Sequence, residues 1–383
     1  MKGFKNVDVY VENAGIINTN LGFENGIITT TQKDSSVEEI CKLPSNAVIV
    51  PGFIDEHIHG ANDADAMDGN IESLSTIANA VVKEGTTTFL ATTMTQSPEN
   101  IKNALNAVKE YKKLNATGGA ELLGVHLEGP FISPKHIGAQ PLEYVVKPSV
   151  EVFKEYEDAS GDSIKIVSLA PEMDGADELI KYLTKKGIVA SIAHTGATYS
   201  DCEKAIEMGV SNVTHTYNAQ TGLHHRDVGV VGSALLKDEL NAELICDTIH
   251  VSVPAIKLVL KNKPHDKITL ITDAMRAKYM PDGESNLGGQ LVIVKNGEAR
   301  LVNGALAGSV LKMNDAIKNL CTKAGVKFED AIDYATVNPA KNLGIFDTVG
   351  SIKVGKRANF TVLDKDTFEV IMTVRDGNIV YKK

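Results

Sequence analysis

The hydrophobic and polar positions of the chain follow one pattern before Pro51 and a different pattern after it. Residues 7–50 contain short runs that are rich in β-branched residues and broken by Gly, Asn and Pro, which is typical of strands joined by turns. From Pro51 onward, strand-like runs alternate with segments of helical periodicity. This alternation indicates βαβ units around a parallel sheet.

The alternating region contains eight strand-like runs, at 53–59, 86–93, 122–128, 164–170, 188–194, 210–216, 242–248 and 268–274. Segments of helical periodicity lie between these runs, at 71–85, 98–114, 176–187, 199–209 and 253–262. Several of these segments end in the Gly expected just past a helix terminus. Eight βα repeats over roughly 290 residues predict a (β/α)8 TIM-like barrel with insertions.

Two further β-rich regions complete the predicted organisation. Segment 282–304 follows the eighth strand and is typical of a β-hairpin inserted before the last helices. The strand pattern returns in 346–383, and neither terminal segment has enough strands for a core of its own. We therefore expect residues 1–50 and 346–383 to form one small β-sandwich lobe and residues 51–345 to form the barrel.

The composition is that of a globular protein and disfavours binding to nucleic acids or membranes. The 383 residues are 43% hydrophobic and 23% charged, as in globular proteins. The formal net charge of −10 disfavours a nucleic-acid or anionic-membrane partner, because phosphates need a basic surface. No apolar run reaches the ~18–20 residues of a membrane span, and the N-terminal residues lack a signal peptide's apolar core. The four Cys form no CxxC pair, so we expect a cytoplasmic protein without a disulfide framework or a thiolate zinc site.

Ionisable residues stand at the ends of predicted strands that should be almost entirely apolar. His57 and His59 close the first strand, and alternation places both on the side that faces the barrel mouth. The other strand-end residues are Glu128 in the third strand, His194 in the fifth, His215 within the sixth and Asp273 in the eighth. The carboxyl ends of the strands are where barrel enzymes assemble their active sites.

A divalent cation accounts for this cluster. A single His is more often a packed, hydrogen-bonded residue than a ligand, and His126 is a candidate for such a residue. Burying so many ionisable groups without partners would cost several kcal/mol each. Imidazole nitrogens and carboxylate oxygens without a thiolate suit zinc, with iron or manganese as alternatives. We therefore expect one or two divalent metal ions per subunit.

Five motifs carry a resemblance to a known family: HxH within PGFIDEHIHG at 51–60, HLEGPF at 126–131, AHTGAT at 193–198, THTYNAQ at 214–220 and TDAM at 272–275. With these motifs the chain resembles the amidohydrolase superfamily and, within it, the group of N-acetylglucosamine-6-phosphate deacetylases. HLEGPF and HTYNAQ are specific to that group, whereas HxH alone marks only the superfamily. The likeness runs almost from end to end and includes GSIKVGKRANFTVLD at 350–364.

The resemblance implies an activity, which is hydrolysis of the acetamide of N-acetyl-D-glucosamine 6-phosphate to D-glucosamine 6-phosphate and acetate in amino-sugar catabolism. It implies metal-bound water as the nucleophile and Asp273 as the general base that later protonates the departing amine. The metal ligands that it implies are Glu128, His194 and His215 for one metal, and His57 and His59 for a second.

The resemblance also implies the contacts to the substrate. Outside the phosphate site these are Ala139, Gln140, Asn218, Ala219, His250, Leu306, Ala307 and Gly308. Many relatives have His where this chain has Gln140, which leaves the role of Gln140 open. Arg226 matches the phosphate-binding Arg, and its planar fork suits a phosphate. In the family this loop reaches an active site across a dimer interface, so the resemblance implies a homodimer.

Three alternatives stay open at this point. One is a deacetylase of another N-acetyl sugar phosphate, such as N-acetylgalactosamine 6-phosphate. A second is a relative of the cyclic amidases, which bridge two metals through a carboxylated lysine on the fourth strand; here Lys165 lies at the opposite end of that strand. The third is a non-catalytic sugar-phosphate sensor, which would not need both Asp273 and the ligand set.

Overall fold

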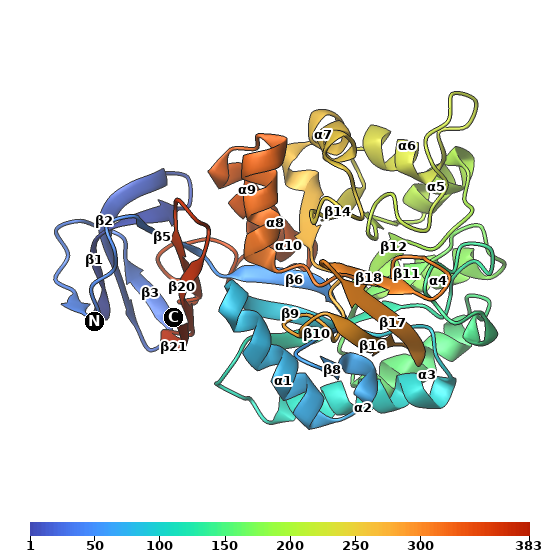
Figure 1. Ribbon diagram of the computed structural model, residues 1–383, viewed down its shortest axis with the longest axis horizontal. Helices are drawn as coiled ribbons and strands as arrows, with labels where there is room; N and C mark the ends of the chain where they lie inside the picture. Colours follow the sequence, from blue (N-terminus) through green and yellow to red (C-terminus); the bar gives the residue numbers. More distant parts are fainter.

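A computed structural model describes residues 1–383. Figure 1 shows a small β lobe that contains both chain ends and, beside it, a larger body in which helices surround a set of strands. None of the helices is both long and apolar enough to cross a membrane. The larger body is the predicted barrel, and the fold class expected from the sequence is confirmed.

Eight parallel strands form the barrel wall, and each overlaps one of the eight predicted runs. In the order in which they pair, they are β6 (Phe53–Ile58), β9 (Thr86–Thr92), β10 (Glu121–Glu128), β11 (Ile164–Leu169), β12 (Val189–Ile192), β13 (Asn212–Val213), β14 (Asn241–Ile245) and β15 (Ile268–Ile271). The wall closes beside β6, where the amide of Asp273 donates to the carbonyl of His57 at 2.8 Å. Across the same seam the Thr272 hydroxyl donates to Asp55 at 2.5 Å.

Helices cover the outside of this wall. They are α1 (Ile71–Val81), α2 (Pro98–Lys113), α3 (Val150–Ser160), α4 (Ala176–Lys186), α5 (Tyr199–Glu207), α6 (Gly229–Leu236), α7 (Val253–Asn262), α8 (Met313–Asn319), α9 (Phe328–Ala335) and α10 (Val337–Asn342). Local signals start and end several of them: the Ser97 hydroxyl caps α2, and Gly187 ends α4 in the left-handed conformation. No helical range was predicted for α3, α6, α8, α9 or α10. Of these, α6 is buried on almost every side and lacks the polar face that marks an amphipathic helix.

The lobe combines both ends of the chain in one sheet. Its strands are β1 (Lys2–Val11), β2 (Gly15–Glu24), β3 (Ile27–Thr30), β4 (Glu38–Glu39), β5 (Ala47–Pro51), β19 (Phe360–Asp364), β20 (Val370–Arg375) and β21 (Asn378–Lys382). Strand β19 pairs antiparallel with β5 and so joins the two terminal segments. All eight strands are linked by hydrogen bonds in a single sheet, so the expected sandwich is one continuous sheet around a core that includes Phe4, Phe23 and Phe360.

We propose residues 1–50 with 346–383 as one structural unit and residues 51–345 as the other. In support of this division, β5 ends at Pro51 and the lobe core draws only on the two terminal segments. The two units pack through a second apolar cluster, in which Val48 and Leu363 join the barrel residue Phe53.

The β-rich insertion holds three strands rather than the two of a simple hairpin. They are β16 (Gly283–Leu287), β17 (Gln290–Lys295) and β18 (Glu298–Leu301), and they form their own antiparallel sheet. The inner face of this sheet packs Leu287 and Val292 against Met94 and Met275, which follow the ends of β9 and β15. The insertion therefore lies against the carboxyl end of the barrel, where the short strands β7 (Gly60–Ala61) and β8 (Ala64–Asp65) also pair.

Candidate active site

Six ionisable side chains meet where the parallel strands of the barrel end. His57 and Glu128 stand within the last two residues of β6 and β10, and His59 directly follows β6. The other three lie two residues past the ends of β12, β13 and β15, namely His194, His215 and Asp273. All six are at most 8% exposed. The common direction of the strands brings them to one rim although they are far apart in the sequence.

Three of these residues have a backbone conformation that their sequence did not reveal. His194, His215 and Asp273 have φ angles of 43°, 32° and 47°, in the left-handed region that residues other than Gly rarely adopt. The strands therefore stop earlier than predicted, and the expectation that His215 lies within the sixth strand is wrong, since β13 ends at Val213. Strained backbone of this kind concentrates at functional sites, where the surrounding structure holds it in place.

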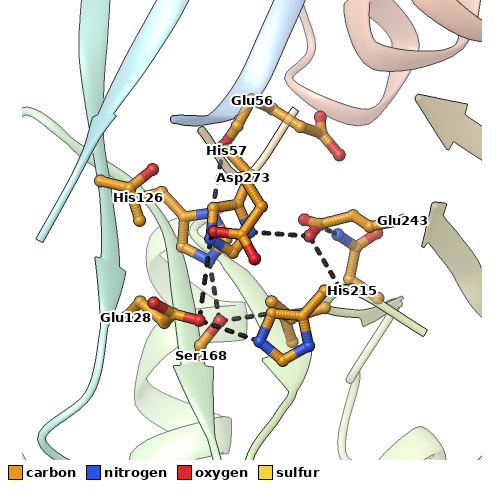
Figure 2. A network of polar contacts seen from close by, with 12 residues as sticks. Glu56, His57, His126, Glu128, Ser168, His215, Glu243 and Asp273 are labelled. Atoms are coloured by element: carbon orange, nitrogen blue, oxygen red, sulfur yellow. Dashed lines mark hydrogen bonds and ion pairs between the residues drawn. The ribbon is translucent and has the colours of Figure 1, made fainter. Parts of the chain in front are cut away.

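Glu128 lies at the centre of the cluster and contacts two groups of histidines. Its Oε1 atom is 3.2 Å from His194 Nε2 and 3.0 Å from His215 Nε2, and these two ring nitrogens are 3.1 Å apart. Its Oε2 atom is 3.3 Å from His59 Nε2, and His57 Nε2 lies 3.7 Å from Oε1. Figure 2 shows this arrangement around Glu128, with His215 on one side and His57 above it. The carboxylate is thus shared between the two ligand groups expected from the sequence.

The outer nitrogens of the histidines indicate which nitrogen faces a cation. Nδ1 of His59 lies 3.2 Å from the Thr92 carbonyl, and Nδ1 of His194 lies 3.0 Å from the His136 carbonyl. A carbonyl only accepts hydrogen bonds, so Nδ1 carries the hydrogen in both rings and Nε2 is left to bind a proton or a metal. His57 Nε2 is buried without a hydrogen-bond partner. These residues fit a divalent cation.

The electrostatics of the cluster also favour bound positive charge. Burial lowers the pKa of His57, but Asp273 and Glu128 outweigh burial and raise it to about 9. Burial raises the pKa of Glu128, yet His57, His194, His215 and His59 together hold it well below its usual value. The carboxylates around His57 thus favour positive charge at this ring, which a proton or a nearby divalent cation can supply.

Asp273 stands next to this group on the cavity side. Its Oδ1 atom is 3.2 Å from His59 Nε2 and 3.5 Å from His57 Nε2. Burial raises the pKa of Asp273, but the two histidines outweigh burial and lower it to about 2. Asp273 is therefore an ionised carboxylate at neutral pH, as a proton acceptor must be.

His126 belongs to the structure of the barrel rather than to the ligand set. It lies near His57 and Glu243, but both of its ring nitrogens are already paired. Nδ1 lies 3.0 Å from the Glu56 carbonyl, and Nε2 lies 2.8 Å from the Ser168 hydroxyl. Burial and neighbouring His57 lower its pKa to about 4, so His126 is neutral and hydrogen-bonded, as expected from the sequence.

A cavity of about 240 Å³ opens beside the cluster. Besides His59, Glu128, His194, His215 and Asp273, its lining includes seven of the substrate contacts that were expected from the sequence: Ala139, Gln140, Asn218, Ala219, His250, Leu306 and Gly308. Ala307 does not line it, because Ala307 is buried in the apolar cluster with Met275. Met94, Gly138, Leu287 and Ala305 also line the cavity and were not expected.

His250 lines this cavity and pairs with a buried carboxylate. Its Nδ1 atom is 2.6 Å from Asp247 Oδ2, and both side chains are less than a tenth exposed. Burial lowers the pKa of His250, but the hydrogen bond and the charge of Asp247 outweigh burial and raise it. The Asp247–His250 pair therefore favours a protonated ring beside a polar ligand.

Gln140 is held between a backbone amide and Glu128. The amide of Thr95 donates to Gln140 Oε1 at 2.7 Å, and Gln140 Nε2 donates to Glu128 Oε2 at 2.9 Å. The first bond fixes the orientation of the side-chain amide, so its NH₂ group must face the carboxylate. Gln140 thus holds the Glu128 oxygen that also faces His59.

Arg226 lies outside the cavity of its own chain. It sits in an exposed loop, where its Nη1 atom is 2.8 Å from His225 Nε2, and it is not among the residues that line the cavity. The structure therefore does not bring Arg226 together with the other substrate contacts expected from the sequence.

One buried carboxylate of the site was missed in the sequence. Glu243 stands in the apolar run of β14, completely buried, with its Oε2 atom 3.1 Å from His57 Nδ1. The sequence did contain a signal for Glu243. Like Glu128, it is an acidic residue inside a strand that should be apolar. Its contact with His57 links strands β14 and β6. These strands are distant in the sequence, so no pattern of neighbouring residues could predict this contact.

The chain matches the amidohydrolase family over residues 48–380. It is 43% identical over 382 residues to the N-acetylglucosamine-6-phosphate deacetylase of Bacillus subtilis (strain 168), covering 98% of this chain and 96% of the relative. It is 35% identical over 317 residues to the N-acetylgalactosamine-6-phosphate deacetylase of Escherichia coli O157:H7, covering 83% and 84% of the two chains.

Solved structures show the same similarity. The N-acetylglucosamine-6-phosphate deacetylase from Thermotoga maritima superposes with a TM-score of 0.90 at 35% identity, covering 100% of both chains. A mutant of the Mycobacterium smegmatis enzyme, solved in complex with N-acetyl-D-glucosamine-6-phosphate, gives 0.92 at 26% identity over 100% of both chains.

Proposed function

Because this chain belongs to the amidohydrolase family, we propose that it hydrolyses the acetamide of N-acetyl-D-glucosamine 6-phosphate to D-glucosamine 6-phosphate and acetate. The observation that carries this function is the position of ionised Asp273 beside the Glu128 cluster, at the wall of a single cavity. Similarity over nearly the whole chain to deacetylases of this sugar phosphate supports the substrate. The protein is thus an enzyme of amino-sugar catabolism, a hydrolase acting on a linear amide.

Two groups of residues are proposed to hold the metal. Glu128, His194 and His215 form the first group, and His57 and His59 form the second with Glu128 between them. Zinc suits these nitrogen and oxygen ligands best, with iron or manganese as alternatives, and one or two ions bind per subunit. A bound divalent cation lowers the pKa of a coordinated water towards about 7 and polarises the acetyl carbonyl.

The side chains of this chain carry the proton and hold the sugar. Asp273 takes a proton from the attacking water as the new C–O bond forms, and returns it to the amide nitrogen as the C–N bond breaks. Acetate and the free amine of the sugar are then the products. The contacts proposed for the sugar are Ala139, Gln140, Asn218, Ala219, His250, Leu306, Ala307 and Gly308, of which Ala307 acts through the loop that carries its neighbours.

Acetate release separates the candidate functions. Wild-type protein should release acetate from N-acetylglucosamine 6-phosphate with a higher kcat/KM than from N-acetylgalactosamine 6-phosphate. The second substrate is included because one relative is named for it, at 35% identity. Preference for the galactosamine compound would reassign the substrate. Binding of the sugar phosphate without acetate release would indicate a sensor.

Arg226 is proposed to bind the phosphate in the cavity of a partner subunit, within a cytoplasmic homodimer. The chain has a net charge of −10 and repels a dianionic substrate at long range, so recognition needs a local cationic group. A charge-assisted hydrogen bond is worth ~1.5–3 kcal/mol. Arg226→Ala should therefore lower kcat/KM for the phosphorylated sugar by roughly 10- to 150-fold.

The unphosphorylated sugar is the control for this prediction. Its kcat/KM should hardly change, because it never makes the contact with Arg226. Arg226→Lys should restore only part of the activity, since an ammonium group cannot make the bidentate pair. Equal losses on both sugars would assign Arg226 to the fold or to the dimer. Sedimentation of wild type and variant would then distinguish these two roles.

Gln140 should act mainly through Glu128. Gln140→Leu preserves much of the volume but leaves the Thr95 amide and Glu128 Oε2 without this partner. Loss of a hydrogen bond to a charged group should lower kcat/KM by roughly 10- to 150-fold. Gln140→His keeps a donor and should lose less. Steady-state kinetics test both variants, and a wild-type value for Gln140→Leu would contradict this role.

A further inference from the structure

Glu243 is a buried carboxylate that the proposed chemistry does not use. It lies in the middle of β14, it is 0% exposed, and it does not line the cavity. It therefore does not touch a substrate. Figure 2 shows it on the side of the cluster away from Glu128, with dashed contacts to His57 and towards His215.

The contacts of Glu243 reach both metal-ligand groups. Its Oε2 atom is 3.1 Å from His57 Nδ1 and accepts the backbone N–H of His215 at 3.3 Å. Its Oε1 atom accepts the side-chain amide of Asn212 at 3.3 Å. The carboxylate thus faces two N–H donors and the Nδ1 atom of His57, from all of which its oxygens can accept. One carboxylate thus binds a residue from each group, the ring of His57 and the backbone of His215.

Each contact fixes a feature that metal binding needs. At His57, an acceptor on Nδ1 keeps the hydrogen on that nitrogen and turns Nε2 towards Glu128 and Asp273. At His215, the backbone is in the left-handed conformation, with a φ of 32°. Its N–H bond to Glu243 helps to hold that strained backbone, from which the ring Nε2 atom reaches Glu128 Oε1 at 3.0 Å.

Glu56 and His126, two other buried groups nearby, do not take over this role. The Glu56 carboxylate binds Asn342, whose side-chain nitrogen lies 3.1 and 3.0 Å from its two oxygens. The Glu56 side chain therefore makes its hydrogen bonds with Asn342 and not with the ligand groups. Both ring nitrogens of His126 are already paired, with the Glu56 carbonyl and the Ser168 hydroxyl. Glu243 is the buried acid that hydrogen-bonds both ligand groups.

We propose that Glu243 is a positioning residue of this enzyme, which orients His57 and His215 together and so sets the affinity of both ligand groups for the metal. This inference rests on the proposed metal-dependent function. Carboxylates that bind the outer nitrogen of a metal-ligating His commonly contribute 10- to 100-fold to metal affinity or activity.

Two substitutions test this role on the full-length protein. Glu243→Leu removes all three acceptor contacts. Glu243→Gln has nearly the same shape and keeps one acceptor oxygen for His57. The Asn212 side-chain oxygen has no partner, so Asn212 can turn its amide over and accept from the new NH₂ group. Glu243→Gln therefore tests the loss of charge in a protein that folds even if Glu243→Leu does not.

The measurement is the affinity for Zn²⁺, obtained by competition with a chromophoric chelator after dialysis against EDTA. Glu243→Leu should bind Zn²⁺ about 100-fold more weakly than wild type, and Glu243→Gln about 10-fold more weakly. Acetate release by Glu243→Gln should recover when Zn²⁺ is added in excess, which a general defect in folding would not do. The matched control is Glu56→Gln, which changes the neighbouring buried acid and should bind Zn²⁺ like wild type.

Wild-type Zn²⁺ affinity in both Glu243 variants would overturn the proposal. Equal losses in Glu243→Gln and Glu56→Gln would also overturn it, because the effect would then follow from any change in the buried acids. The binding measurement needs no substrate, so it is independent of the reaction. If wild type released no acetate while the Glu243 variants still lost Zn²⁺ affinity, the proposed function would fail and the positioning role would stand.

Discussion

Asp273→Asn should lower kcat for acetate release by ~10²–10⁴, which is the usual contribution of general acid–base catalysis. The substitution removes the ionised carboxylate next to the histidine pair and almost preserves its size. Metal should be retained, because Glu128 and the four histidines are unchanged. The checks are steady-state kinetics together with elemental analysis of the same preparation.

Asp65→Asn is the matched control for this variant. Asp65 is also a buried acid near the rim, but its side chain accepts the backbone N–H of Met67 at 2.9 Å, a capping role that Asn also fills. Its kcat should stay close to wild type. If Asp273→Asn also kept wild-type kcat, another group would move the proton and the assignment of Asp273 would be withdrawn.

Metal removal should abolish acetate release, because both the activated water and the polarised carbonyl depend on the bound cation. Purified protein should contain a divalent transition metal, and dialysis against a chelator should remove the metal and the activity together. Readdition of zinc, iron or manganese, each alone, would identify the metal that restores the highest kcat. Full activity at a metal content near zero would contradict the site as a whole.

The two ligand groups should respond differently to substitution. His194→Asn removes a ligand of the first group, and its loss of activity should be at least the ~100-fold expected for a residue that only supports a ligand. If the first group alone carries the chemistry, His57→Asn should lower metal content more than it lowers kcat. Elemental analysis and kinetics of both variants test this, and equal losses of kcat would show that both groups are needed.

The sequence by itself determined the architecture of the barrel. Runs of β-branched residues alternate with amphipathic helical segments, and such periodicity reports local structure directly. Ionisable residues inside apolar strands then marked the rim, since burying them without partners is unfavourable. His57, His59 and Glu128 could be placed in this way because each lies within its strand or directly after it.

The tertiary structure decided how these residues work together. No local pattern pairs Glu243 with His57 or Gln140 with Glu128, because each pair forms only when strands or loops distant in sequence pack at one rim. The left-handed backbone of His194, His215 and Asp273 is also held by neighbours rather than by propensity. Periodicity is a property of adjacent residues, whereas the geometry of this site is set by the closed barrel, in which β15 meets β6 across more than two hundred residues of chain.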